Sequence, residues 1–144
     1  KRICALKEAL LCLYAQTCRD FELLLMAHNV DDAKTKEIED LISSFPHDFL
    51  NKIRLIPVTG GTRTTPLIEG FKAARGIYIS IYDDDDIVFD NWVETFRSLY
   101  DEAPGRILHA YATEQDWTVL KSGGSISLTN ARRQSLFIAV NSIW

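Results

Sequence analysis

Apolar residues in the first part of the chain alternate between helical and strand-like spacing. In residues 2–16 they recur every three or four positions, which predicts an amphipathic helix. Residues 21–27 are almost continuously apolar, as in a strand that is covered on both faces. Helical spacing returns in residues 31–45, and residues 53–58 predict a second strand. The pattern therefore predicts the order helix, strand, helix, strand.

The alternation continues in the next part of the chain. A polar loop precedes a helix predicted over residues 65–76, with Thr65 as its N-cap and Gly76 as a glycine stop. Residues 77–82 are rich in β-branched and aromatic side chains. These residues therefore predict a third strand.

A further helix is predicted up to residue 100, capped by Asp90 or Asn91, and two shorter strands are expected at 106–112 and 116–120. The whole alternation predicts an α/β fold, with an open, mostly parallel sheet and helices on both faces, as in Rossmann-like proteins. Because no repeat or linker divides the 144 residues, a single domain is expected over residues 1–144.

The composition narrows the expected partners and location. The formal net charge is -4 and the pI is near 5.3, so no overall basic field favours nucleic acid. The longest apolar run, residues 21–27, is far shorter than the roughly 18–20 residues that a membrane crossing needs. No secretory leader is evident, and Cys4, Cys12 and Cys18 are expected to be buried free thiols in a reducing compartment. The prediction is a cytoplasmic protein, with peripheral contact to a membrane left open.

Four consecutive aspartates, Asp83–Asp86, directly follow the predicted third strand. Adjacent carboxylates repel one another, so such a run either lies in a solvated loop or needs a counter-charge. The carboxyl end of a parallel strand is the edge at which open α/β sheets bind ligands. Residues two apart in an extended segment point the same way, so Asp83 and Asp85 can aim at one Mg²⁺ or Mn²⁺ ion.

The loop Gly60-Gly61-Thr62-Arg63 lies between the second strand and a predicted helix. Free backbone N–H groups at a helix N-terminus and the forked guanidinium of Arg63 suit a phosphate. The sequence is neither a Walker motif nor a dinucleotide-binding turn, and two glycines before a helix are also common in ordinary loops. A phosphate-binding loop after one strand and an acidic cluster after the next would flank one crevice.

Several stretches match one family pattern when they are taken together. The run Ala74–Ile79 followed by Asp83–Asp86 is similar to an Ala-x-Gly-x-Tyr-Ile stretch before an Asp-x-Asp-Asp motif, and further likeness lies in Leu6–Leu10, Gln16-Thr17, Phe21–Leu23 and Gly70. On these residues the chain resembles the nucleotide-sugar-dependent glycosyltransferases of family 2, which have the GT-A fold.

The resemblance implies an activity and a set of site residues. A sugar would pass with inversion from a nucleoside-diphosphate donor, with a UDP-sugar as the first expectation, to a hydroxyl of a carbohydrate or lipid-linked acceptor. A divalent ion, Mn²⁺ or Mg²⁺, would be held by Asp83 and Asp85, with Asp84 near the ribose or sugar and Arg63 near the nucleotide.

The chain also departs from the family pattern in several places. The family's first strand and its acceptor-binding part are not matched, so an incomplete GT-A fold is expected, and activity of this chain alone is left open. Where the family has a base-contacting aspartate, this chain has other residues, which leaves His28 and Asp31 as candidates for donor binding. The catalytic base is unknown; Glu114 and Asp116 are the acidic residues nearest its expected place, and neither is assigned the role.

Two other classes of function remain open at this point. The acidic run would also suit a Mg²⁺-dependent phosphoryl-transfer or phosphatase domain, although the lysine and the Thr or Ser partners of such a site are not placed by the sequence. A non-catalytic binding module, with the aspartates in a solvated loop, is the second alternative, and it predicts no response to metal ions.

Overall fold

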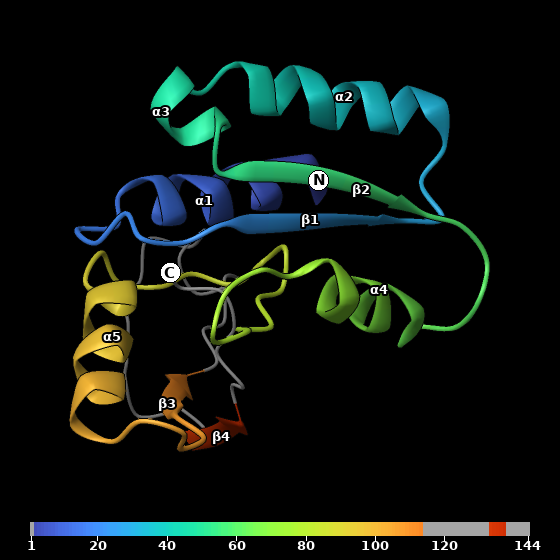
Figure 1. The fold of residues 1–144 in the computed structure, drawn as a ribbon. Coiled ribbons are helices and arrows are strands. Elements are labelled where there is room, and N and C mark those ends of the chain that lie inside the picture. Colours follow the sequence, from blue (N-terminus) through green and yellow to red (C-terminus); the bar gives the residue numbers. More distant parts are fainter. Residues whose placement is uncertain (1, 114–132, 138–144) are drawn as a thin grey trace.

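The computed structural model describes residues 2–113 and 133–137, the last five residues of each part by their backbone (Figure 1). The helices are α1 (Arg2–Tyr14), α2 (Asp32–Ser43), α3 (His47–Leu50), α4 (Thr65–Ala73) and α5 (Trp92–Glu102), and the strands are β1 (Leu23–His28), β2 (Ile53–Val58), β3 (His109–Thr113) and β4 (Arg133–Phe137). The predicted α/β class is confirmed. The strand predicted at 116–120 lies outside the described residues.

The described strands form two separate two-stranded sheets. β1 and β2 are parallel, with Leu23 opposite Ile53 and His28 opposite Val58. β3 and β4 are antiparallel, with His109 opposite Phe137. The small open parallel sheet agrees with an incomplete GT-A, Rossmann-like fold.

Helices cover both faces of the β1–β2 sheet, as predicted. Leu23 and Leu25 alternate along β1 toward the face packed by α1 and α2, where they join the largest apolar cluster. On the opposite face Met26 lies against α4, where a Cβ on Gly70 would be 3.6 Å from the Met26 sulfur. Figure 1 shows α2 and α4 on opposite sides of the two strands. This layering buries alternate residues of each strand on different helices.

The main core surrounds Phe49 of α3, whose side chain is fully buried. Its ring makes edge-type contacts with Tyr14 at 5.4 Å and Phe21 at 6.5 Å between centroids, and a tilted contact with Phe45 at 5.3 Å. The other buried members of this cluster come from α1, namely Leu6, Leu10 and Leu13. A second, smaller cluster consists of Val93, Phe96 and Leu108.

Two helices, α2 and α4, end earlier than predicted. The helix predicted over 31–45 ends at Ser43, because Pro46 begins a separate short helix that the sequence pattern did not reveal. The helix predicted over 65–76 starts at Thr65 with Thr64 as N-cap, and it ends at Ala73 because Ala74 is extended (φ −66°, ψ 143°). The prediction of Gly76 as the stop was therefore wrong.

The predicted third strand over residues 77–82 was wrong. Only Ile79 makes a single bridge, and the rest of the segment is irregular. Strand-forming side chains do not make a strand without a neighbouring backbone, since the ladder hydrogen bonds come from the partner. In the described part of the chain, β1 pairs with β2 and β3 with β4, so none of these strands pairs along 77–82.

The start of α5 is capped by a residue far away in sequence. Asn91 occupies the N-cap position, which is one of the two predicted positions, but its side chain makes no capping hydrogen bond. The Gln16 side chain, which is buried, accepts from the Val93 amide at 2.9 Å and donates to the Phe89 carbonyl at 2.7 Å. This amide fixes the end of α1 to the start of α5.

Two further predictions concern the cysteines and the membrane. All three cysteines are free, as expected, but Cys4 is exposed and Cys12 and Cys18 are half-buried. The prediction of buried thiols was wrong, because the apolar face of α1 is formed by its leucines instead. Among the described residues, the helices are too short and too polar to cross a membrane.

Candidate functional site

The carboxyl ends of β1 and β2 lie at the same end of the sheet, and the loop of residues 59–64 leaves from there (Figure 1). Asn29, which follows β1, has a positive φ of 52°. Its side-chain oxygen accepts from the backbone amide of Gly60 at 2.7 Å, and its backbone amide donates to the Val58 carbonyl at 2.9 Å. These contacts tie the two strand ends together.

His28 belongs to this same loop support. Its Nε2 atom lies 2.9 Å from the Gly60 carbonyl and 3.2 Å from Asn29 Nδ2. The carbonyl can only accept, so the contact with Gly60 is a hydrogen bond when Nε2 carries the proton. The structure thus gives His28 a role in holding the loop. Its predicted role in binding the nucleotide-sugar donor stays a prediction.

The loop itself is shaped by its glycines. Gly60 and Gly61 have φ values of 70° and 75°, and a Cβ on Gly61 would come within 2.2 Å of the Thr65 hydroxyl oxygen. That hydroxyl accepts from the Thr62 amide at 2.8 Å at the start of α4. Arg63 is exposed, and within residues 2–113 its side chain has no hydrogen bond or ion pair. The loop therefore presents a free cation next to a helix N-terminus.

Asp31 has a local structural task. Its Oδ1 atom accepts from the Lys34 amide at 2.8 Å, and it is the N-cap of α2. One carboxylate oxygen is engaged in this bond, so its predicted role in donor binding would have to coexist with capping.

The four aspartates form a turn after the irregular segment 77–82. The Asp86 amide donates to the Asp83 carbonyl at 3.2 Å, and the Tyr82 hydroxyl donates to the Asp86 carbonyl at 2.7 Å. Asp83 and Asp85 are exposed, and among the described residues their side chains have no hydrogen bond or ion pair. The turn holds these two carboxylates in solvent.

Asp84 is paired with a residue that the sequence did not indicate. Arg2, in the first turn of α1, donates from Nε to Asp84 Oδ2 at 2.8 Å and from Nη2 to Asp84 Oδ1 at 3.2 Å. The two residues are 82 positions apart, and α1 begins well before the predicted site, so no local motif could have pointed to the pair. Among the described residues, Arg2 is the cation that pairs with the tetrad, the run of four aspartates Asp83–Asp86.

Burial and the charges of Asp83–Asp86 shift the pKa values of groups in and beside the acidic turn. Burial raises the pKa of Asp86, and the negative charges of Asp83 and Asp85 raise it further. Burial also raises the pKa of the Tyr82 phenol, with smaller contributions from Cys12 and Asp86. The hydrogen bond to Asp84 raises the pKa of Arg2. The carboxylates of the turn thus stabilise a nearby cation, as the shift of Arg2 shows.

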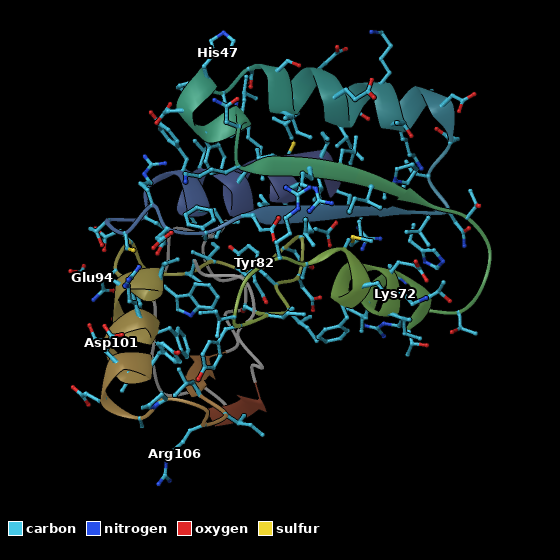
Figure 2. All side chains as sticks on the ribbon, in the orientation of Figure 1. His47, Lys72, Tyr82, Glu94, Asp101 and Arg106 are labelled. Carbon is cyan, nitrogen blue, oxygen red and sulfur yellow. The ribbon has the colours of Figure 1, made fainter. Side chains whose placement is uncertain are left out.

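The predicted crevice between the glycine loop and the acidic turn is not assembled in the described residues. The loop of residues 59–64 lies beyond the ends of β1 and β2 (Figure 1), whereas Tyr82, which immediately precedes the aspartates, lies below the first part of β1 (Figure 2). The sequence reasoning placed the acidic residues at the end of a third parallel strand, and that strand is absent here.

The carboxylate oxygens of the acidic turn are ligands that suit a hard divalent cation. Mg²⁺ is commonly bound through one or two carboxylates together with substrate phosphates and water. Asp83 and Asp85 supply two accessible carboxylates of this kind. In the part of the chain that the structure describes, no three His, Cys, Asp or Glu side chains converge as a complete metal site. Two carboxylates are compatible in number with a divalent ion whose other ligands are phosphates and water.

The sequence model of glycosyl transferase family 2 matches residues 2–138, which is nearly the whole chain. The chain belongs to this family of glycosyltransferases. No curated protein matches the sequence.

Proposed function

We propose that this domain binds the nucleoside-diphosphate moiety of a sugar donor with a divalent ion, Mn²⁺ or Mg²⁺, and supports inverting transfer of the sugar to an acceptor hydroxyl. The observation that carries the proposal is the pair of exposed, unengaged carboxylates, Asp83 and Asp85, within a chain of the glycosyltransferase family. A UDP-sugar is the proposed donor, and a carbohydrate or lipid-linked hydroxyl is the proposed acceptor.

Each residue of the acidic turn has a distinct task in this proposal. Asp83 and Asp85 would hold the metal, which when bound stabilises negative charge that develops on the leaving diphosphate. Asp84, which Arg2 contacts in the metal-free chain, has free lone pairs on both oxygens and would accept from hydroxyls of the ribose or sugar. Arg63 would supply a forked cation near the nucleotide from the glycine loop.

The proposal requires the loop and the acidic turn to act on one ligand. A nucleoside diphosphate carries its phosphates between its base and its sugar, so it can bridge groups that do not touch one another. His28 and Asp31 lie at the same sheet end as the loop and are the proposed neighbours of the base. The candidate base residues Glu114 and Asp116 lie outside the described residues, and the catalytic base is left unassigned.

The test is isothermal titration of the chain with UDP, GDP and their common sugar conjugates, with and without Mn²⁺. Asp85→Asn removes one proposed metal ligand, and it should abolish metal-dependent nucleotide binding while leaving the fold intact, because the substitution relieves repulsion between carboxylates. Asp101→Asn, on the exposed side of α5 (Figure 2), is the matched control and should bind like the wild type.

The outcomes separate the proposed function from its alternatives. Metal-dependent binding that survives in Asp85→Asn would contradict the assignment of the metal ligands. Nucleotide binding without any influence of Mn²⁺ would favour a binding module over a metal-dependent transferase. Release of phosphate from a simple phosphate ester in the presence of Mg²⁺ would favour phosphoryl-transfer chemistry. A cytoplasmic location is part of the proposal, with peripheral contact to a membrane left open, and fractionation of cells tests both.

A further inference from the structure

The acidic turn already holds a cation that comes from the protein itself. The Arg2 guanidinium binds both oxygens of Asp84 through two parallel hydrogen bonds of 2.8 and 3.2 Å. This bidentate geometry is the arrangement that guanidinium and carboxylate groups prefer. Asp84 is 34% exposed and the Arg2 side chain is 86% exposed, so the pair forms at the surface and is reached by ions from solvent.

The influence of Arg2 extends beyond its direct partner. The pKa of Arg2 is raised first by the hydrogen bond and charge of Asp84, and then also by the charges of Asp85 and Asp83. The guanidinium is therefore within electrostatic reach of both carboxylates that are proposed to hold the metal. A divalent ion at Asp83 and Asp85 would experience repulsion from the same guanidinium.

We propose that Arg2 is an internal counter-ion of the acidic turn that opposes divalent metal binding, so that metal binding weakens the contact between Arg2 and Asp84. This inference rests on the proposed metal site and names the residue that regulates it. In the metal-free protein Arg2 neutralises part of the charge of four adjacent carboxylates. When a metal ion binds, the ion takes over this neutralisation and the guanidinium is released.

The effect is expected to be moderate, because the pair is exposed. Exposed ion pairs contribute little to stability, and the corresponding change in an affinity is at most about fivefold. The coupling is reciprocal by thermodynamic necessity: if Arg2 lowers metal affinity by some factor, bound metal lowers the affinity of Arg2 for Asp84 by the same factor. Two independent measurements therefore report the same quantity.

The first measurement is the affinity of the chain for Mn²⁺ alone, without nucleotide. Arg2→Gln should bind Mn²⁺ about two- to fivefold more tightly than the wild type. Arg106→Gln is the matched control, since it removes the same charge from an exposed position remote from Tyr82 and the acidic turn (Figure 2). Its affinity for Mn²⁺ should equal that of the wild type within about 1.5-fold.

The second measurement follows Arg2 itself. The Nε–H group of an arginine that is held by a carboxylate exchanges slowly with water and gives a separate NMR signal. Addition of Mg²⁺, which is diamagnetic, should shift the Arg2 signal or remove it by exchange, while the signal of Arg54, bonded to Glu22 and to the Ala73 carbonyl, stays unchanged.

The results distinguish failure of this inference from failure of the proposed function. Equal Mn²⁺ affinities of Arg2→Gln and Arg106→Gln, with an unchanged Arg2 signal, overturn the inference and leave the metal site standing. Weaker Mn²⁺ binding in Arg2→Gln also overturns it. Absence of Mn²⁺ binding in the wild type and in Arg2→Gln overturns both proposals. Binding that is detected only in Arg2→Gln supports the inference, and circular dichroism verifies that each variant is folded.

Discussion

Residues 2–58 and residues 77–91 are built differently, although the two segments lie against each other. The first segment forms both strands of the parallel sheet and surrounds Phe49 with aromatic and leucine side chains. The second segment has one bridged residue and exposes large apolar side chains, including Phe89 at 84% and Ile77 at 60%. The residues that stabilise the fold and the residues proposed to bind the ligand therefore lie in different segments. The first segment forms the packed core, and the second carries the exposed carboxylates.

Several kinds of contact connect the segments, besides the ion pair of Arg2 with Asp84. Tyr82 and Val88, on either side of the aspartates, pack partly against the Phe49 cluster. Gln16 joins the end of α1 to Phe89 and Val93. The acidic turn is thus held at its flanks by the scaffold, while the carboxylates of Asp83 and Asp85 stay in solvent.

The strongest test of this contrast exchanges one phenylalanine in each segment for alanine. Phe49→Ala should lower the free energy of unfolding by about 3–5 kcal/mol, because a fully buried ring leaves a cavity among Tyr14, Phe21 and Phe45. Phe89→Ala removes an exposed ring and should change it by less than about 0.5 kcal/mol. Urea denaturation measures both, and similar losses in the two variants would contradict the separation.

The link between the segments can be broken at Gln16. Gln16→Leu keeps a buried side chain of similar size but leaves the Val93 amide and the Phe89 carbonyl without this partner. The expected loss in unfolding free energy is about 1–3 kcal/mol. Gln16→Glu retains an oxygen for the Val93 amide and loses the donor to Phe89. Comparing the two variants therefore separates the contributions of these two hydrogen bonds to the unfolding free energy. A stability equal to that of the wild type for Gln16→Leu would show that the link is not important.

The smallest effect is expected within the acidic turn, at Asp86. Burial raises its pKa in the folded protein above the unfolded value, so ionised Asp86 destabilises the fold at neutral pH. Asp86→Asn should therefore be more stable than the wild type at pH 7, by less than about 1 kcal/mol because the group is partly exposed. The difference should shrink as the pH falls through the raised pKa of Asp86 and should disappear below the unfolded value. Thermal denaturation between pH 3 and about pH 7 measures it, and an Asn variant less stable at pH 7 would contradict the assignment.

The sequence predicted those elements whose own residues determine them. β2 was predicted with its observed bounds, and α1, α2 and β1 differ from prediction only at their ends, because periodic apolar residues meet a well-packed core there. The strand over 77–82 failed for the opposite reason. A strand depends on a partner backbone as well as on its own side chains, and the periodicity of one segment does not reveal whether a partner is present.

The candidate site was predictable only in part. The aspartates and the glycine loop were visible because each is a local motif. The Arg2 contact with Asp84 and the hydrogen bonds of His28 and Asn29 to Gly60 join residues far apart in sequence, and they follow from the packing of α1, β1 and β2. Asp31 shows the converse: a residue considered for donor binding also has a local role as a helix cap.

The central claim, that the acidic turn binds the divalent ion, is tested most directly by NMR of the isotope-labelled chain with substoichiometric Mn²⁺ and UDP. Paramagnetic Mn²⁺ broadens the signals of nuclei close to it. The account predicts that the amides of Asp83–Asp86 broaden first, that the Arg2 signal follows, and that Asp85→Asn removes the effect. Broadening centred on other acidic residues, or a pattern unchanged in Asp85→Asn, would contradict the claim.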